Sequence, residues 1–290
     1  GPDDLFVAIT SEGECIIYSG NDPSSSTAWN LVGVFNIGKP IGNRCIEKVG
    51  SDFVVITQDG AILLSAFLPI DQVASYSQAI TNNIQNEFLQ SARDYSHIYG
   101  WQSIHYPQGS FSLFNIPNST TESVQYVVNS QTGAWCKFTG QNAACWSLFK
   151  GNLYFGAQAG GVVYKADTGS NIDWKIRPAF SYFGTRGNQK LFTLCRPHFQ
   201  SNGHPSYAID LNVNFTNISP TSVPTTQTSS NALWDTAKWD EALWADEVIS
   251  DAWTTVYGLG ECASPTIRGS MKLTMSFRAY DMLWQTGSSI

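Results

Sequence analysis

Three tryptophans, two of them followed directly by aspartate, are the residues in this sequence best suited to binding chemistry. Trp234, Trp239 and Trp244 recur every five residues, and Asp235 and Asp240 follow the first two. Exposed indole rings can stack on sugars or nucleic-acid bases. A period of five scatters the rings over different faces of a helix or strand, so we expect a chain of tight turns. These five residues are the candidate contact site. We favour rings that anchor a long loop to its own domain or to a neighbouring subunit over rings that bind a ligand.

The sequence contains none of the common motifs for catalysis, cofactor binding or metal binding. The sequence has no phosphate-binding glycine loop, no zinc-binding HExxH and no GxSxG nucleophile motif. The pairs Asp240-Glu241 and Asp246-Glu247 suggest glycoside hydrolysis, but neighbours on a strand point apart, so we expect solvated charges. Alternating polar residues from Asp167 to Asp173 resemble the start of a calcium loop without its glycine and distal glutamate, which favours a polar linker. We therefore predict no catalytic, cofactor-binding or metal-binding residues.

The composition indicates a folded chain with unusually little charge. Of 290 residues, 42% are hydrophobic and only 13% are charged, against about 25% in an ordinary soluble protein. The net charge of −7 argues against a tight nucleic-acid binder. No apolar run reaches the roughly 18 residues that a membrane span needs. Such a chain must hide neutral surface, either in many short buried strands or in a large subunit interface.

The six cysteines form no CxxC pair, and the closest two, Cys136 and Cys145, are nine residues apart. This spacing does not fit a zinc ribbon or a redox motif. We expect buried free thiols.

A hairpin signal recurs in residues 1–170. An aromatic residue opens an apolar run, glycine follows seven residues later, and a second apolar run follows; the glycines are Gly13, Gly60, Gly133 and Gly161. Glycine supplies the positive φ that such turns need. The glycine spacings of 47, 73 and 28 residues are irregular around the roughly 40–45 of a propeller blade. We predict a partial or irregular β-propeller, with consecutive hairpins of another all-β domain as the alternative.

A helix is predicted near residues 71–92, inserted among the hairpins. Val73, Ile80, Ile84 and Phe88 share one helical face, and Asp71 is a suitable N-cap. The opposite face is rich in Gln, Asn and Ser. It either caps an edge of the β domain or is covered by a partner.

Residues 171–290 are predicted to form a β-sandwich. Apolar and polar residues alternate strictly over 207–215 and over 272–280, where Leu273, Met275, Phe277 and Ala279 form the apolar set. This period of two is typical of half-buried antiparallel strands, and Lys190–Phe199 reads as another strand. A long Trp-rich loop near 219–253 is predicted between the strands at 207–215 and 272–280. The fold class is therefore all-β.

The sequence resembles the tail nozzle proteins of short-tailed bacteriophages, also called packaged-DNA stabilisation or tail accessory factors. The resemblance is clearest over residues 120–245 and rests on the order of several segments. These are, in chain order, 129–140 (NSQTGAWCKFTG), 144–149 (ACWSLF), 152–156 (NLYFG), 163–169 (VYKADTG), 179–184 (AFSYFG), 190–193 (KLFT), Arg196-Pro197, Trp234-Asp235 and Trp239-Asp240.

The resemblance implies a structural virion protein that assembles in the bacterial cytoplasm and is not an enzyme. It implies a homohexameric ring around the DNA exit channel, next to the tail adaptor and to tail needle or receptor-binding proteins. Such rings often form only on the growing tail, so the isolated chain is expected to be a monomer. Double-stranded DNA would pass through without specific binding. The ring would help to retain and eject the genome.

Two other functions stay open. The Trp repeat and carboxylates from distant loops would suit a carbohydrate-binding or glycan-cleaving tail protein. A secreted propeller adhesin is the other, and intramolecular disulfides would indicate it.

Overall fold

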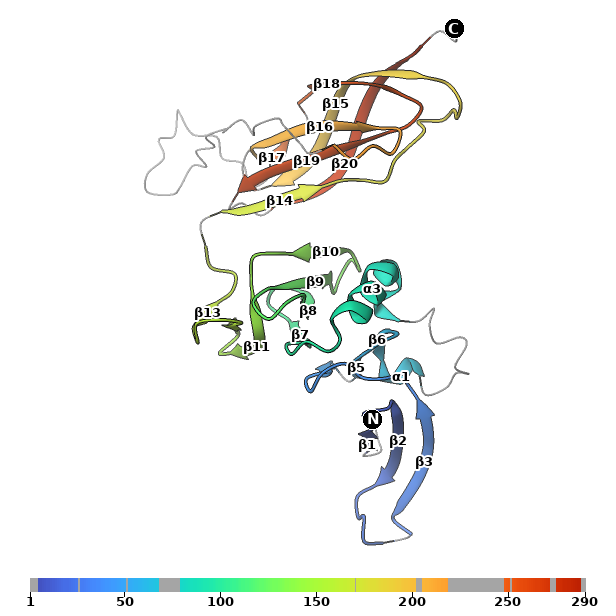
Figure 1. The fold of residues 1–290 in the computed structure, drawn as a ribbon, viewed down its shortest axis with the longest axis vertical. Coiled ribbons are helices and arrows are strands. Elements are labelled where there is room, and N and C mark those ends of the chain that lie inside the picture. Colours follow the sequence, from blue (N-terminus) through green and yellow to red (C-terminus); the bar gives the residue numbers. More distant parts are fainter. Residues whose placement is uncertain are drawn as a thin grey trace. The chain divides into compact units, whose positions relative to one another are not determined.

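The computed structural model describes residues 5–25, 27–50, 52–67, 79–169, 171–201, 205–218, 248–250, 252–271 and 275–287. The chain divides into two compact units, Gly1–Asp167 and Thr168–Ile290, where the sequence suggested a boundary after residue 170. Both units consist mainly of antiparallel sheets (Figure 1), so the all-β prediction is confirmed. Among the described residues, no helix is long and apolar enough to cross a membrane.

The described part of the first unit forms four antiparallel sheets in which each strand pairs with its neighbour in the chain. The strands are β1 (Leu5–Ile9), β2 (Glu14–Gly20) and β3 (Trp29–Asn36); β4 (Ile46–Val49), β5 (Asp52–Thr57) and β6 (Gly60–Leu63); β7 (Gln102–Tyr106), β8 (Phe111–Pro117), β9 (Ser123–Asn129) and β10 (Trp135–Phe138); β11 (Ala143–Phe149), β12 (Asn152–Ala157) and β13 (Val163–Lys165). Separate hydrophobic clusters join the first sheet to the second, the second to the third and the third to the fourth. The unit is thus built of successive blade-like sheets, as in an irregular propeller.

The four predicted hairpin glycines all adopt positive φ. Gly13, between β1 and β2, has φ 96°, and a Cβ added there would lie 2.3 Å from the carbonyl oxygen of Gly38. A side chain is therefore excluded both by the backbone conformation and by the close approach of the neighbouring loop.

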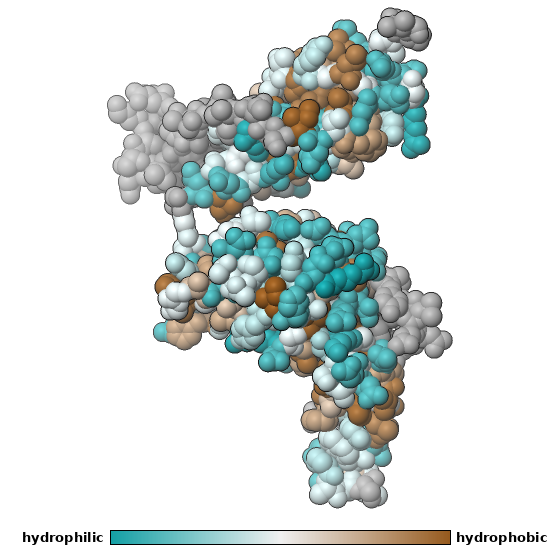
Figure 2. All heavy atoms as spheres, in the orientation of Figure 1, coloured by the Kyte–Doolittle hydropathy of each residue, from teal (hydrophilic) through white to brown (hydrophobic). Residues whose placement is uncertain are grey.

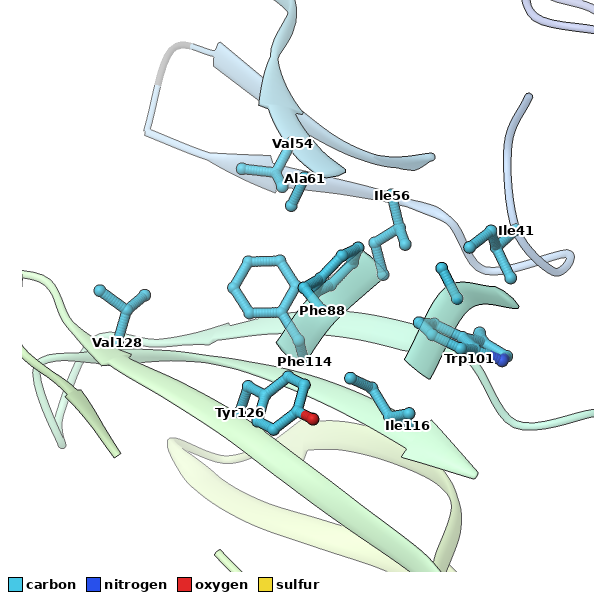
Figure 3. Close-up of a cluster of buried hydrophobic side chains, with 11 residues drawn as sticks. Ile41, Val54, Ile56, Ala61, Phe88, Trp101, Phe114, Ile116, Tyr126 and Val128 are labelled. Carbon is cyan, nitrogen blue, oxygen red and sulfur yellow. The ribbon is translucent and has the colours of Figure 1, made fainter. Parts of the chain in front are cut away.

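The inserted helical segment lies between β6 and β7. Its described parts are α1 (Leu64–Phe67), the 3₁₀ helix η2 (Ile80–Ile84) and α3 (Gln85–Tyr95). The predicted N-cap Asp71 and Val73 lie outside the described residues. Phe88 and Ala92 of α3 are buried in the core between the second and third sheets (Figure 3), where Phe88 contacts Trp101 edge-on with ring centroids 6.1 Å apart. The apolar face of the helix thus completes a core that the two sheets share.

The second unit is a sandwich of two sheets. One contains β14 (Ile172–Ile176), β19 (Ala263–Met271) and β16 (Tyr207–Val213); the other contains β17 (Val248–Ser250), β15 (Lys190–Ser201), β18 (Thr254–Gly260) and β20 (Met275–Thr286). Buried residues from both sheets form one core: Cys195, Phe199, Ile209, Val256 and Ile267. This is the layer arrangement that the strand pattern predicted.

Three details of the prediction for this unit are wrong. Phe215 lies beyond the end of β16 and is 64% exposed. The strand β17 lies within the stretch 219–253 that was predicted as a loop.

The third detail concerns β20. Ala279 was expected to face the core, but it is exposed, and Tyr280 packs on the core instead. The pairing between β15 and β20 shifts there, because Phe199 pairs with Phe277 while His198 pairs with Ala279. This β-bulge inserts an extra residue and reverses the alternation of faces beyond it.

Candidate functional site

The predicted contact site cannot be placed. Trp234, Asp235, Trp239, Asp240 and Trp244 all lie outside the described residues. The carboxylates from Glu241 to Glu247 lie there too. A role for the Trp repeat, in ligand binding or in anchoring, stays a prediction.

The described histidines occupy separate places. His105 Nδ1 lies 2.9 Å from the Ser112 hydroxyl, His198 contacts Asp281, and His97 is exposed after α3. His204 is outside the described part of the chain. Within the described ranges, no group of three His, Cys, Asp or Glu side chains is arranged to hold a metal ion.

The strongest candidate for a functional surface is the outward side of the first sheet. Alternate residues of its strands, Cys15, Ile17 and Phe35, face the second sheet and pack near Val55 and Ile62. The residues between them must point to the opposite side of the sheet. We call this side the apolar outer face, and it is formed by Phe6, Ile16, Tyr18, Trp29, Leu31 and Val34.

Aromatic stacking organises the apolar outer face. The Trp29 ring stacks on Tyr18 with centroids 5.3 Å apart and contacts Phe6 at 5.8 Å. Phe6 is 53% exposed and Val34 57% exposed. Figure 2 shows hydrophobic atoms at the surface along β3. A sheet that is apolar on both faces is typical of a strand layer packed between two others, so this face fits a protein–protein contact.

The last sheet of the same unit also exposes apolar residues. Phe149 and Val163 are 61% and 70% exposed, and the Phe149 ring contacts Tyr154. The register places Lys165 beside Tyr154, on the side away from the buried Leu153. The apolar outer face instead carries Glu14 at its edge, paired with Asn36.

A charged cluster lies on the outward side of the sandwich. Arg196 Nε donates to Asp281 Oδ2 over 3.0 Å, and His198 Nε2 lies 3.0 Å from the same oxygen. Hydrogen bonds from Arg196 and His198 hold the pKa of Asp281 below its usual range. The Arg196 guanidinium also lies 4.7 Å from the centre of the Trp253 ring. The cation lies over one face of that ring, while Trp253 stays 45% exposed.

This cluster was not predicted from the sequence because its members are far apart in the chain. Arg196 and His198 alternate along a predicted strand, which was the available signal for a shared face. The partner Asp281 is brought in only by the pairing of β15 with β20.

All six cysteines are free thiols in the structure. Burial was predicted for them, and this is right for Cys15, Cys195 and Cys262 but wrong for Cys136, which is exposed on β10. Burial, with the Asp281 carboxylate nearby, raises the pKa of Cys195 to about 12. That thiol is therefore protonated at neutral pH and is a poor nucleophile.

No family model matches the chain, and no curated protein matches it either.

Proposed function

We propose that this chain is a structural virion protein, a subunit of the tail nozzle of a short-tailed bacteriophage. In this role copies of the chain form a homohexameric ring around the DNA exit channel, which helps to retain the packaged genome and to pass it during ejection. The tail adaptor and the tail needle or receptor-binding proteins are its neighbours. The sequence resemblance suggests the family, and the apolar outer face is the structural observation that supports an assembled state.

The apolar outer face argues for assembly because its contact with water is unfavourable in free energy. Burying a large apolar side chain stabilises a protein by roughly 1.5–3 kcal/mol. Leu31 and Val34 are both more than half exposed in the isolated chain. Their burial in an assembly would therefore contribute substantially to association, and a chain with so few charges has little else to keep such a face solvated.

A second copy of the chain is the occupant that best fits this face. Within the first unit, blade-like sheets already pack on one another through faces of the same apolar kind. The exposed side of the last sheet is also apolar, with Phe149 61% and Val163 70% exposed. Head-to-tail contact between the first sheet of one copy and the last sheet of the next would therefore bury two exposed apolar surfaces together. Such a heterologous contact closes into a ring when its rotation permits.

Labelling of virus particles tests the proposal. Antibodies against the chain, viewed by electron microscopy on particles from the source lysate, should mark the distal end of a short tail. Purified particles without label would overturn the virion role and would favour the carbohydrate-binding alternative.

A pair of variants tests the contact itself. Val34→Asp places a charge in the apolar outer face, and Thr121→Asp places one in an exposed loop of the third sheet as a matched control. Circular dichroism first checks that both variants are folded. We then expect that Val34→Asp is excluded from virus particles and that Thr121→Asp is incorporated. Equal incorporation would contradict a subunit contact at this face.

A further inference from the structure

A cavity of about 200 Å³ lies in the first unit, where three segments of the chain meet. These segments are the loop before β4, the stretch between α3 and β7, and the start of β11. Half of the lining residues have polar side chains, namely Asn43, Arg44, Ser96, His97 and Tyr99, and the other half are Gly42, Ile98, Gly100, Trp101 and Ala144.

The cavity is rich in donors in a protein of net charge −7. None of its described lining residues is Asp or Glu. Within the described residues, the Arg44 guanidinium and the His97 imidazole take part in no hydrogen bond or ion pair. Lys39 and Lys137 are paired, with Glu12 at 3.3 Å and Glu87 at 3.0 Å, whereas the exposed Arg93 and Lys175, like Arg44, make no ion pair within the described residues. Arg44 and His97 are both exposed residues that line this one cavity, and the lining contains no carboxylate.

The end of α3 does not cancel the preference of the cavity for an anion. The last carbonyl groups of a helix favour cations, and Ser96 at the end of α3 lines the cavity. The Tyr95 carbonyl, however, already accepts bonds from Ile98 N and Trp101 Nε1, both at 2.9 Å. The Ala92 carbonyl accepts from Ser96 N. These two carbonyl groups at the end of α3 are therefore already occupied by donors.

We propose that this cavity binds a phosphate group. A guanidinium donates two parallel hydrogen bonds to phosphate oxygens, and amide, hydroxyl and imidazole donors from other directions can satisfy the remaining ones. Tyr99, 63% exposed beside the cavity, offers a ring to whatever the phosphate is attached to. The group is either free phosphate or a phosphate ester such as the backbone of a nucleic acid. This inference does not depend on the proposed virion role.

Isothermal titration of the full chain with inorganic phosphate tests the site. The test variant is Arg44→Gln, and the matched control is Arg93→Gln, which removes an exposed arginine of α3 outside the cavity. Hydrogen bonds to charged groups contribute roughly 1.5–3 kcal/mol, so Arg44→Gln should weaken binding about tenfold or more. Arg93→Gln should bind like the unmodified chain, and His97→Gln should weaken binding as a second, independent variant.

A competition arm separates the two sources of phosphate. A short single-stranded oligonucleotide that binds and is displaced by inorganic phosphate, in the unmodified chain but not in Arg44→Gln, identifies a nucleic-acid backbone as the ligand. Phosphate binding without oligonucleotide binding identifies free phosphate. No saturable phosphate binding, or equal binding by folded Arg44→Gln, would overturn the inference.

Discussion

Trp146 Nε1 donates a hydrogen bond to Asn115 Oδ1 over 3.0 Å and so ties β11 of the fourth sheet to β8 of the third. Asn115 is fully buried. Its Nδ2 donates to the carbonyls of Gly100 and Ala143, and its Oδ1 also accepts from Gln125 Nε2. One amide therefore satisfies four polar groups in the interior, where each would be costly to leave unpaired.

Replacing Asn115 by leucine keeps the branched shape of the side chain but removes the bonds to Trp146 Nε1 and to the carbonyls of Gly100 and Ala143. Gln125 Nε2 keeps its bond to the Gln141 carbonyl. We expect Asn115→Leu to lower the free energy of unfolding of the first unit by roughly 3 kcal/mol or more, because each unsatisfied buried group costs about 1–3 kcal/mol. Urea denaturation followed by tryptophan fluorescence measures it. Asn86→Leu, on the exposed side of α3, is the control and should change stability little. Equal stabilities of the two variants would refute the role of Asn115.

The sandwich contains a buried lysine that holds a loop. Lys190 is fully buried, and its Nζ donates to the carbonyls of Thr185, Asn188 and Glu261. We expect Lys190→Met to destabilise the second unit by roughly 3 kcal/mol, since a methionine fills the space but leaves three carbonyls without a donor. Hydrogen exchange should show faster exchange over 185–189. Lys175→Met, at an exposed position of β14, is the control variant. Equal hydrogen-exchange rates over 185–189 in the two variants would show that Lys190 does not hold this loop.

The strands and hairpins could be predicted because their signals are local. Gly13 and Gly60 mark tight turns that a few neighbouring residues predict, and alternation over 207–215 predicted a strand there, observed as β16. The alternation did not predict which residues are buried, because Asn212 is buried and Phe215 is 64% exposed. The position of Ala279 could not be predicted, because a bulge is decided by how two strands pair. The contacts of Asn115 and of Asp281 depend on residues brought together from distant strands, and no short-range pattern encodes them.

Tyr126 should make the first unit sensitive to alkali. Burial, reinforced by the Glu87 carboxylate, raises the pKa of Tyr126 from 10.0 to about 12. The folded chain thus keeps the phenol proton to higher pH than the unfolded chain does. The free energy of unfolding should therefore fall as pH rises from 10.0 towards about 12.

Tyr126→Phe should flatten this fall, because phenylalanine has no proton to lose. Denaturation midpoints across that pH range measure the slope. The variant also loses the bond between Tyr126 Oη and Ser91 Oγ, so it should start from lower stability at neutral pH. Tyr257→Phe, at a strongly exposed position of β18, should keep the slope of the unmodified chain. An unchanged slope in Tyr126→Phe would contradict the assignment.

Thiol alkylation should distinguish Cys136 from Cys195. Desolvation raises the pKa of Cys136, but its side chain is exposed, whereas Cys195 is fully buried in the sandwich core with a pKa of about 12. Only an accessible thiolate reacts with iodoacetamide, so Cys136 should be modified in the native chain and Cys195 only when the second unit opens. Timed alkylation followed by peptide mass spectrometry measures both rates. In Lys190→Met, the rate at Cys195 should rise while the rate at Cys136, in the other unit, stays the same. Equal rates at the two thiols in the native chain would show that the sandwich core is not closed around Cys195.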